Sequence, residues 1–148
     1  MSVKAYADSS FIVSLYLPEP ERTDCAVRYM ERHREALPFT PQHRLEVRNA
    51  VRLLVWAKRI TAVDRSRAFR EIETDFDAQD FLIHTALNHA DVYRRAEALS
   101  AAHNERIGCR SADLFHIAAA LELGLDEFVT FDEKQKAFAS AAGLKVAF

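Results

Sequence analysis

Glycine and proline are both scarce in this chain, with 3 and 4 residues among 148. Tight turns depend on these two residues, so their scarcity argues against an all-β sandwich or barrel and favours a helix-rich chain. The two cysteines, Cys25 and Cys109, form no CxxC pair or metal-type cluster, which is typical of buried thiols in a reducing compartment. No apolar run is long enough to cross a bilayer and the first residues lack a signal-peptide core, so we expect a cytoplasmic protein.

The chain has no excess of positive charge. Lys and Arg number 20 and Asp and Glu number 22, which gives a formal net charge of −2. Proteins that bind nucleic acid through bulk charge alone are usually basic. A polyanionic ligand of this chain would therefore need a local basic patch, a bound cation, or both.

The chain does contain enough apolar material for one core. Hydrophobic residues make up 49% and charged residues 28%, as in ordinary soluble globular proteins. A domain of this size buries enough surface to fold without disulfides or metals. We therefore expect a single domain over residues 1–148.

Hydrophobic periodicity and capping residues predict strands that alternate with helices. The expected strands are 3–7, 38–39, 81–83, 128–131 and 144–148, and the expected helices cover 11–17, 40–59, 88–105, 112–123 and 133–142, with two more that begin at Pro20 and after Thr61. Thr61 and Ser111 are expected as helix caps, and the helix after Ser111 is apolar on all sides and so predicted to be buried. The predicted fold is α/β, with a central, mostly parallel sheet flanked by helices on both faces.

Two aspartates, Asp8 and Asp132, stand where a predicted strand passes into a helix. The carboxyl ends of parallel strands lie at one edge of a sheet, where ligands of such folds bind. Helix capping is the better explanation of each residue taken alone. Their shared edge keeps open the hypothesis that they form a site.

Two further acids lie in helices with apolar neighbours. Asp113 is in the first turn of the apolar helix, where either the free helical amides or a cation or hydroxyl partner would stabilise it. Glu46 lies on the helix over 40–59, and an ion pair with a base such as Arg48 is its simplest explanation.

Three arginines, Arg44, Arg48 and Arg52, recur every four residues and so share one helix face. This arginine stripe would face a nucleic-acid backbone, a partner protein, or only water. A solvated face is the commonest outcome for such a run.

Convergence of Asp8, Glu46, Asp113 and Asp132 would have a chemical consequence. Four carboxylates at close quarters cannot all stay ionised unless a cation neutralises them. A site made only of oxygen atoms suits Mg²⁺ or Mn²⁺ rather than zinc. Such a cation polarises a phosphoryl oxygen and activates water, which indicates phosphodiester hydrolysis without a covalent enzyme intermediate.

Four segments of the chain resemble the PIN-domain family, most closely its VapC-like toxins of type II toxin–antitoxin modules. They are Tyr6-Ala7-Asp8-Ser9-Ser10, Leu45-Glu46-Val47-Arg48-Asn49-Ala50, Ser111-Ala112-Asp113-Leu114-Phe115-His116, and Val129-Thr130-Phe131-Asp132. They occur in this order on the predicted elements, and the resemblance covers essentially the whole chain.

The resemblance implies a Mg²⁺- or Mn²⁺-dependent endoribonuclease. Asp8, Glu46 and Asp113 match the three acids that hold the metal in the family, and Asp132 matches a fourth, more variable acid. Ser9 matches a small hydroxyl residue that helps to order the site. The resemblance also implies a homodimer, an RNA substrate and a small antitoxin that covers the acidic pocket.

Other functions have less support. The second position after Asp8 is Ser10, where a haloacid-dehalogenase phosphatase needs an acid, and Lys145 is misplaced for a receiver domain. No histidine belongs to a zinc motif, and His116 is better explained as a packed residue. The main alternative is a catalytically inert module of this fold that binds RNA or a partner protein.

Overall fold

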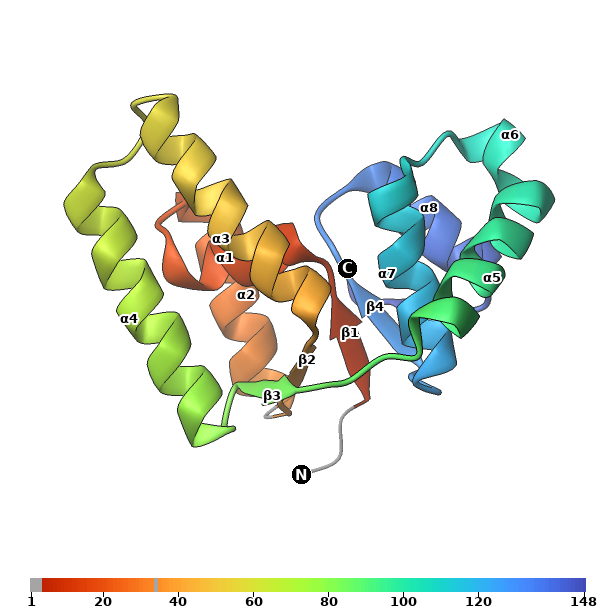
Figure 1. The fold of residues 1–148 in the computed structure, drawn as a ribbon, viewed down its shortest axis with the longest axis horizontal. Helices are drawn as coiled ribbons and strands as arrows, with labels where there is room; N and C mark the ends of the chain where they lie inside the picture. Colours follow the sequence, from red (N-terminus) through yellow and green to blue (C-terminus); the bar gives the residue numbers. More distant parts are fainter. Residues whose placement is uncertain (1–3, 34) are drawn as a thin grey trace. The chain divides into compact units, whose positions relative to one another are not determined.

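The computed structural model describes residues 4–33 and 35–148, and only the backbone of Pro20. The predicted start of the first strand at Val3 therefore lies outside the described residues. The described chain forms two compact units, one of Ser9–Thr85 and one that combines residues 4–8 with Ala86–Phe148 (Figure 1). The described part of the chain thus starts in the second unit, crosses to the first after Asp8 and returns after Thr85.

The second unit contains a parallel sheet whose strand order is β1-β4-β5. These strands are β1 (Ala5–Ala7), β4 (Glu127–Val129) and β5 (Lys145–Val146). In register, Tyr6 of β1 is opposite Phe128 of β4. Helix α7 (Ser111–Glu122) packs on β1 and β4, and α8 (Glu133–Ala141) packs on β4 and β5.

The core of the second unit is built around α7. Its residues Leu114–Ala120 are all buried, which confirms the prediction of a buried apolar helix. The predicted helix over 88–105 is observed as α5 (His89–Leu99), the π-helical segment η1 (Ser100–Asn104) and α6 (Glu105–Ile107). Gly108 follows in the left-handed conformation, with φ of 79°, which a glycine adopts without strain.

The first unit contains four helices and a two-stranded parallel sheet among its described residues. They are α1 (Ser9–Tyr16), α2 (Pro20–His33), β2 (Leu37–Phe39), α3 (Pro41–Trp56), α4 (Ala62–Ala78) and β3 (Leu82–His84). Helices α3 and α4 pack against each other (Figure 1). Thr40 and Thr61 cap them through hydrogen bonds from the backbone N–H groups of His43 and Asp64, which confirms the predicted cap at Thr61.

Several predicted boundaries are wrong. Helix α1 begins at Ser9 rather than Phe11, and α3 ends at Trp56 rather than near Arg59 because Lys58 turns into the left-handed region with φ of 59°. Ser111 is not the cap of α7, since Arg110 occupies that position and Ser111 begins the helix. The predicted α/β class with parallel strands is confirmed among the described residues. None of the described helices combines the length and apolarity that a membrane span requires.

Candidate active site

Asp8 directly follows β1 and is almost fully buried, with 3% of its surface exposed. Its backbone N–H donates a 3.1 Å hydrogen bond to the carbonyl of Val129, which extends the β1–β4 pairing. Its Oδ2 accepts a 2.8 Å hydrogen bond from the hydroxyl of Thr130. A buried carboxylate needs such donors. Burying a carboxylate without a hydrogen-bond partner would cost on the order of several kcal/mol, because the group loses its hydration and gains nothing in return.

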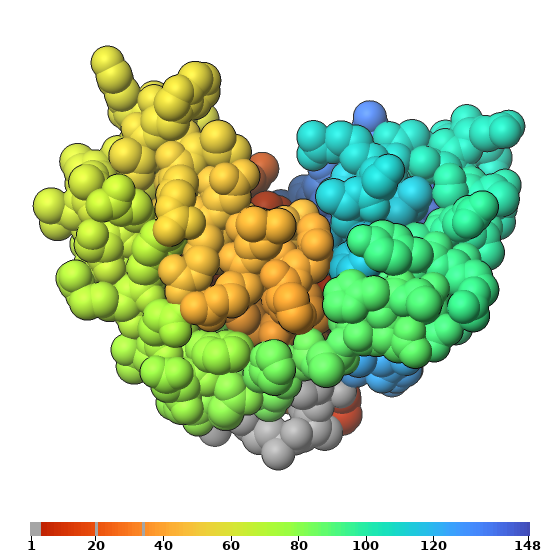
Figure 2. Space-filling model, in the orientation of Figure 1, coloured from red at the N-terminus to blue at the C-terminus, as the bar shows by residue number. Residues whose placement is uncertain are grey.

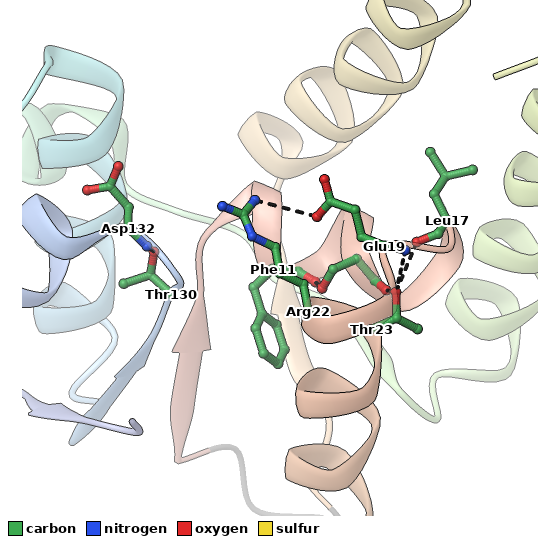
Figure 3. A network of polar contacts seen from close by, with 8 residues as sticks. Phe11, Leu17, Glu19, Arg22, Thr23, Thr130 and Asp132 are labelled. Carbon is green, nitrogen blue, oxygen red and sulfur yellow. Dashed lines mark hydrogen bonds and ion pairs between the residues drawn. The ribbon is translucent and has the colours of Figure 1, made fainter. Parts of the chain in front are cut away.

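Thr130 connects the ends of β1 and β4. Besides donating to Asp8, its Oγ1 accepts a 3.0 Å hydrogen bond from the backbone N–H of Asp132 (Figure 3). The side chain is buried, with 1% exposed, so the hydroxyl is held in this position. Sequence reasoning did not find this role, although a threonine two residues before a strand-end aspartate was the available signal.

Asp132 caps α8, as its position in the sequence indicated. Its Oδ1 accepts a 2.8 Å hydrogen bond from the backbone N–H of Gln135. The residue itself is exposed, so one carboxylate oxygen serves the cap while the group stays at the surface. Capping and a role in a site are therefore compatible for this residue.

Asp113 is connected to the same end of the sheet through Gln135, whose Nε2 donates a 3.1 Å hydrogen bond to Oδ1 of Asp113. Burial raises the pKa of Asp113 above its ordinary value, the neighbouring Arg110 opposes this rise, and the carboxylates of Asp132 and Asp8 raise the pKa further. The carboxylates of Asp132 and Asp8 thus disfavour the charged form of Asp113.

Gln135 is a second residue that sequence reasoning missed. It bonds to both Asp113 and Asp132 and is 6% exposed. Its Oε1 is buried and has no hydrogen-bond partner among the described residues. An unsatisfied buried oxygen beside two carboxylates is the kind of acceptor that a hydrated cation would satisfy. A pocket of about 320 Å³ lies here, lined by Arg110, Asp113 and Asp132 among others.

The donor chemistry of this place fits a hard divalent cation. Carboxylate and amide oxygens are the ligands that Mg²⁺ and Mn²⁺ prefer, and a cation would relieve the repulsion felt by Asp113. The side chains are not arranged as a ready-made metal cluster, however. Within residues 4–33 and 35–148, no group of three or more His, Cys, Asp or Glu side chains is placed to hold a metal ion.

Glu46 and Ser9 belong to the first unit. The hydroxyl of Ser9, at the start of α1, donates a 2.8 Å hydrogen bond to Oε1 of Glu46 on α3. An ion pair of Glu46 with Arg48, Arg52 or another base was the simplest expectation from the sequence, and of these bases Arg48 pairs with Glu73 instead. The structure thus brings Asp8, Asp113 and Asp132 together in one unit, and the meeting of Glu46 with them stays a prediction.

The arginine stripe of α3 packs against α4. Arg44 and Arg48 both pair with Glu73, the first at 2.9 Å. The guanidinium groups of Arg48 and Arg52 lie 4.9 and 5.0 Å from the ring centre of Phe69. The sequence analysis had considered a nucleic acid, a partner protein or water beside the arginine stripe, but not α4. The contacts with α4 favour a packing role for the stripe.

His116 is a packed residue, as predicted. Its Nδ1 lies 2.7 Å from the hydroxyl of Tyr6 on β1, and its side chain is buried. This pair joins α7 to the sheet in the core of the second unit.

These features define an α/β fold of parallel strands in which the carboxylates of Asp8, Asp113 and Asp132 lie near the carboxyl ends of β1 and β4. The model of the PIN domain family matches residues 5–141, and the chain belongs to this family, as its four motifs indicated. PIN domains are generally nucleases, which supports a hydrolase. No curated protein matches the chain at a significant level.

A solved structure has the same fold. The crystal structure of FitAcB from Neisseria gonorrhoeae is similar to this chain with a TM-score of 0.62 and 17% sequence identity. The similarity covers 96% of this chain and 95% of that one. At this level of identity the likeness establishes a shared fold.

Proposed function

We propose that this protein is a divalent-metal-dependent endoribonuclease. The supporting observation is the network in which Thr130 and Gln135 connect the carboxylates of Asp8, Asp113 and Asp132. The family is one of nucleases in general, and the acids match those that the family resemblance implies as metal ligands. Glu46, oriented by Ser9, is proposed as the fourth acid.

The residues have distinct tasks in this proposal. Asp8, Asp113, Glu46 and Asp132 would hold Mg²⁺ or Mn²⁺, which when bound polarises a phosphoryl oxygen and lowers the pKa of water. Thr130 fixes one oxygen of Asp8, and Gln135 fixes one oxygen of Asp113, so both carboxylates enter the reaction already oriented. Ser9 does the same for Glu46.

We further propose that the protein acts as the toxin of a toxin–antitoxin pair, as a homodimer in the cytoplasm. The family resemblance carries this proposal, and an antitoxin would cover the acidic site. Both cysteines are free thiols, which agrees with a reducing compartment.

Replacement of Asp8 tests the nuclease. Asp8→Asn keeps an acceptor for Thr130 but removes the charge, so we expect cleavage of total RNA in Mn²⁺ to fall by at least about 100-fold, within the range that an essential electrostatic group contributes. The wild type should cleave RNA in Mn²⁺ and lose this activity in EDTA. Asp77→Asn is the matched control, because Asp77 is an exposed aspartate on α4.

The competing function is an inert module that binds RNA or a protein. The absence of a ready-made metal cluster in the described part of the chain favours it. The same experiment separates the two functions. Full cleavage by Asp8→Asn, or cleavage in EDTA, contradicts the proposed site, and RNA binding by a wild type that never cleaves supports the inert module.

A further inference from the structure

A pocket of about 310 Å³ lies within the first unit between α1, the start of α2 and the end of α3. We call it the α1–α3 pocket. The residues that line it include the apolar Val13, Leu54 and Ile60 and the basic Arg22 and Arg59. Aliphatic side chains offer an apolar surface for the face of a base, and arginines beside them offer positive charge for its phosphate, although this lining lacks the aromatic side chains on which bases usually stack.

The α1–α3 pocket lies on the same face of α3 as Glu46. Ala50 and Leu54, one and two turns beyond Glu46, both line it. Ser10, also in the lining, directly follows the Ser9 that holds Glu46. Eight residues of helix rise by about 12 Å, which is the length of about three stacked nucleotides at about 3.4 Å each.

The charges of the pocket favour an anion. Arg22 pairs with Glu19 at 3.5 Å, with 53% and 61% of the two side chains exposed (Figure 3). A surface pair of this kind is weak and exchanges easily for another partner. Arg59 is exposed and forms no salt bridge with the residues that the structure describes. The charged residues of the described lining are Arg22, Arg59 and Glu19, so its formal charge is positive. The end of α3 and the turn that follows it, drawn in yellow, lie at the surface (Figure 2).

Two other parts of the first unit are less suited to RNA. Arg44 and Arg48 lie two residues before and after Glu46. Because a helix turns about 100° per residue, each lies about 160° from Glu46 around the axis of α3. Both arginines pair with Glu73 of α4. The larger pocket of this unit, of about 730 Å³, has a charged lining that is acidic in its described residues, including Glu31 and Asp75, and would repel phosphate.

We propose that the α1–α3 pocket binds one nucleotide of a single-stranded RNA, about three nucleotides from the bond that is cleaved. The base packs on the apolar wall, and the adjoining phosphate pairs with Arg59 and Arg22. These arginines are positioning residues, because they hold RNA away from the reacting atoms. The inference rests on the proposed function, since it takes Glu46 as part of the cleavage site.

The test measures RNA binding separately from cleavage. In the Asp8→Asn background, the affinity for a fluorescein-labelled ten-nucleotide RNA of random sequence is followed by anisotropy over a series of salt concentrations. We expect Arg59→Gln to weaken binding by about five- to tenfold and to reduce the salt slope by about 1, as the loss of one phosphate contact does. Lys58→Gln is the matched control, because it removes the same charge from the neighbouring exposed residue, which does not line the pocket. It should change the affinity less than about twofold.

The outcomes separate the pocket from the nuclease. If Arg59→Gln and Lys58→Gln lose equal amounts of RNA affinity, or if the RNA does not bind measurably, the proposal that the pocket binds a nucleotide is wrong. If the wild type then still cleaves RNA in Mn²⁺, the proposed function stands. A specific loss in Arg59→Gln together with a wild type that never cleaves supports the pocket and overturns the nuclease.

Discussion

Thr130 is the residue that most directly sets the geometry at the end of the sheet. Its one hydroxyl donates to Asp8 and accepts from the backbone of Asp132, so two strand ends share a single buried group. Hydrogen bonds to a charged group contribute about 1.5–3 kcal/mol, more than neutral ones. The cost of burying Asp8 is thus offset locally, and one oxygen of its carboxylate is held in place by the Thr130 hydroxyl.

Asp113 provides the residue-scale test of cation binding. Its carboxylate is partly buried and is repelled by Asp132 and Asp8, and for these reasons its pKa is raised. Asp113→Asn removes the charge and keeps an acceptor for Gln135. In EDTA at neutral pH we therefore expect the variant to melt a few degrees above the wild type, since about 1 kcal/mol corresponds to about 2–4 °C in a domain of this size.

Mn²⁺ should reduce or reverse the difference in melting temperature between Asp113→Asn and the wild type. The reason is that Mn²⁺ binds the native wild type and raises its melting temperature. Melting curves followed by circular dichroism, with and without Mn²⁺, give both quantities. Equal Mn²⁺ shifts in the two proteins would mean that the cation binds elsewhere. A variant that melts below the wild type in EDTA would mean that the carboxylate is well stabilised without a cation.

At the scale of elements, the pairing of α3 with α4 explains the arginine stripe. Arg44 and Arg48 share the carboxylate of Glu73, and Arg48 and Arg52 lie against the ring of Phe69. Such contacts hold two neighbouring helices together and leave the opposite side of α3 to Glu46. Packing on α4 thus uses the side of α3 opposite Glu46, and our proposal assigns the Glu46 side to the active site.

Arg48→Gln tests this division. Arg48 is the least exposed of the paired arginines of the stripe, with 21% of its side chain exposed, and its replacement should lower the free energy of unfolding by about 1 kcal/mol. RNA affinity should fall less than in Arg59→Gln. Urea denaturation and the anisotropy assay measure the two effects. Arg94→Gln is the control, because the Arg94–Asp91 pair is exposed.

A stable Arg48→Gln variant with strongly reduced RNA affinity would show that the arginine stripe is an RNA-binding face. A loss of stability no greater than in Arg94→Gln would show that the pairing with α4 contributes little. Either result would contradict the packing role.

At the scale of the whole molecule, the chain passes twice between its two units. Residues 4–8 form part of the second unit, although the next residue begins the first. The second unit is not a continuous segment, and all described residues of the first unit are inserted between its two parts. We therefore expect both units to unfold in one transition, as predicted for a single domain over residues 1–148.

Cys109 reports on this transition. It is 7% exposed, and burial raises its pKa to about 11, with the carboxylates of Asp113 and Asp132 contributing to the rise. In a Cys25→Ser variant we expect iodoacetamide to modify the folded protein at pH 8 far more slowly than the unfolded chain, whose thiol has an ordinary pKa of about 8.5. Because the thiolate is the reactive form, the native rate should rise with pH towards about 11.

In urea, the modification of Cys109 should follow the loss of helical signal by circular dichroism, since coincident transitions are the mark of two-state unfolding. A helical signal that falls at lower urea than the labelling would show that the first unit unfolds separately. In that case the prediction of one domain would be wrong.

The sequence by itself determined those features that depend on neighbouring residues. The caps at Thr40, Thr61 and Asn88 follow from bonds between residues three apart, and the burial of α7 follows from its unbroken apolar run. The strand-end positions of Asp8 and Asp132 were also predicted, because parallel strands place their carboxyl ends at one edge.

Only the tertiary structure decided which side chains meet across long separations. The bond between Thr130 and Asp8 joins residues 122 positions apart, and that between Ser9 and Glu46 joins residues 37 apart. The roles of Gln135 and the surroundings of the arginine stripe were decided in the same way. Local pattern fixes which face of a helix a residue occupies, but the packing of the whole chain fixes what that face contacts.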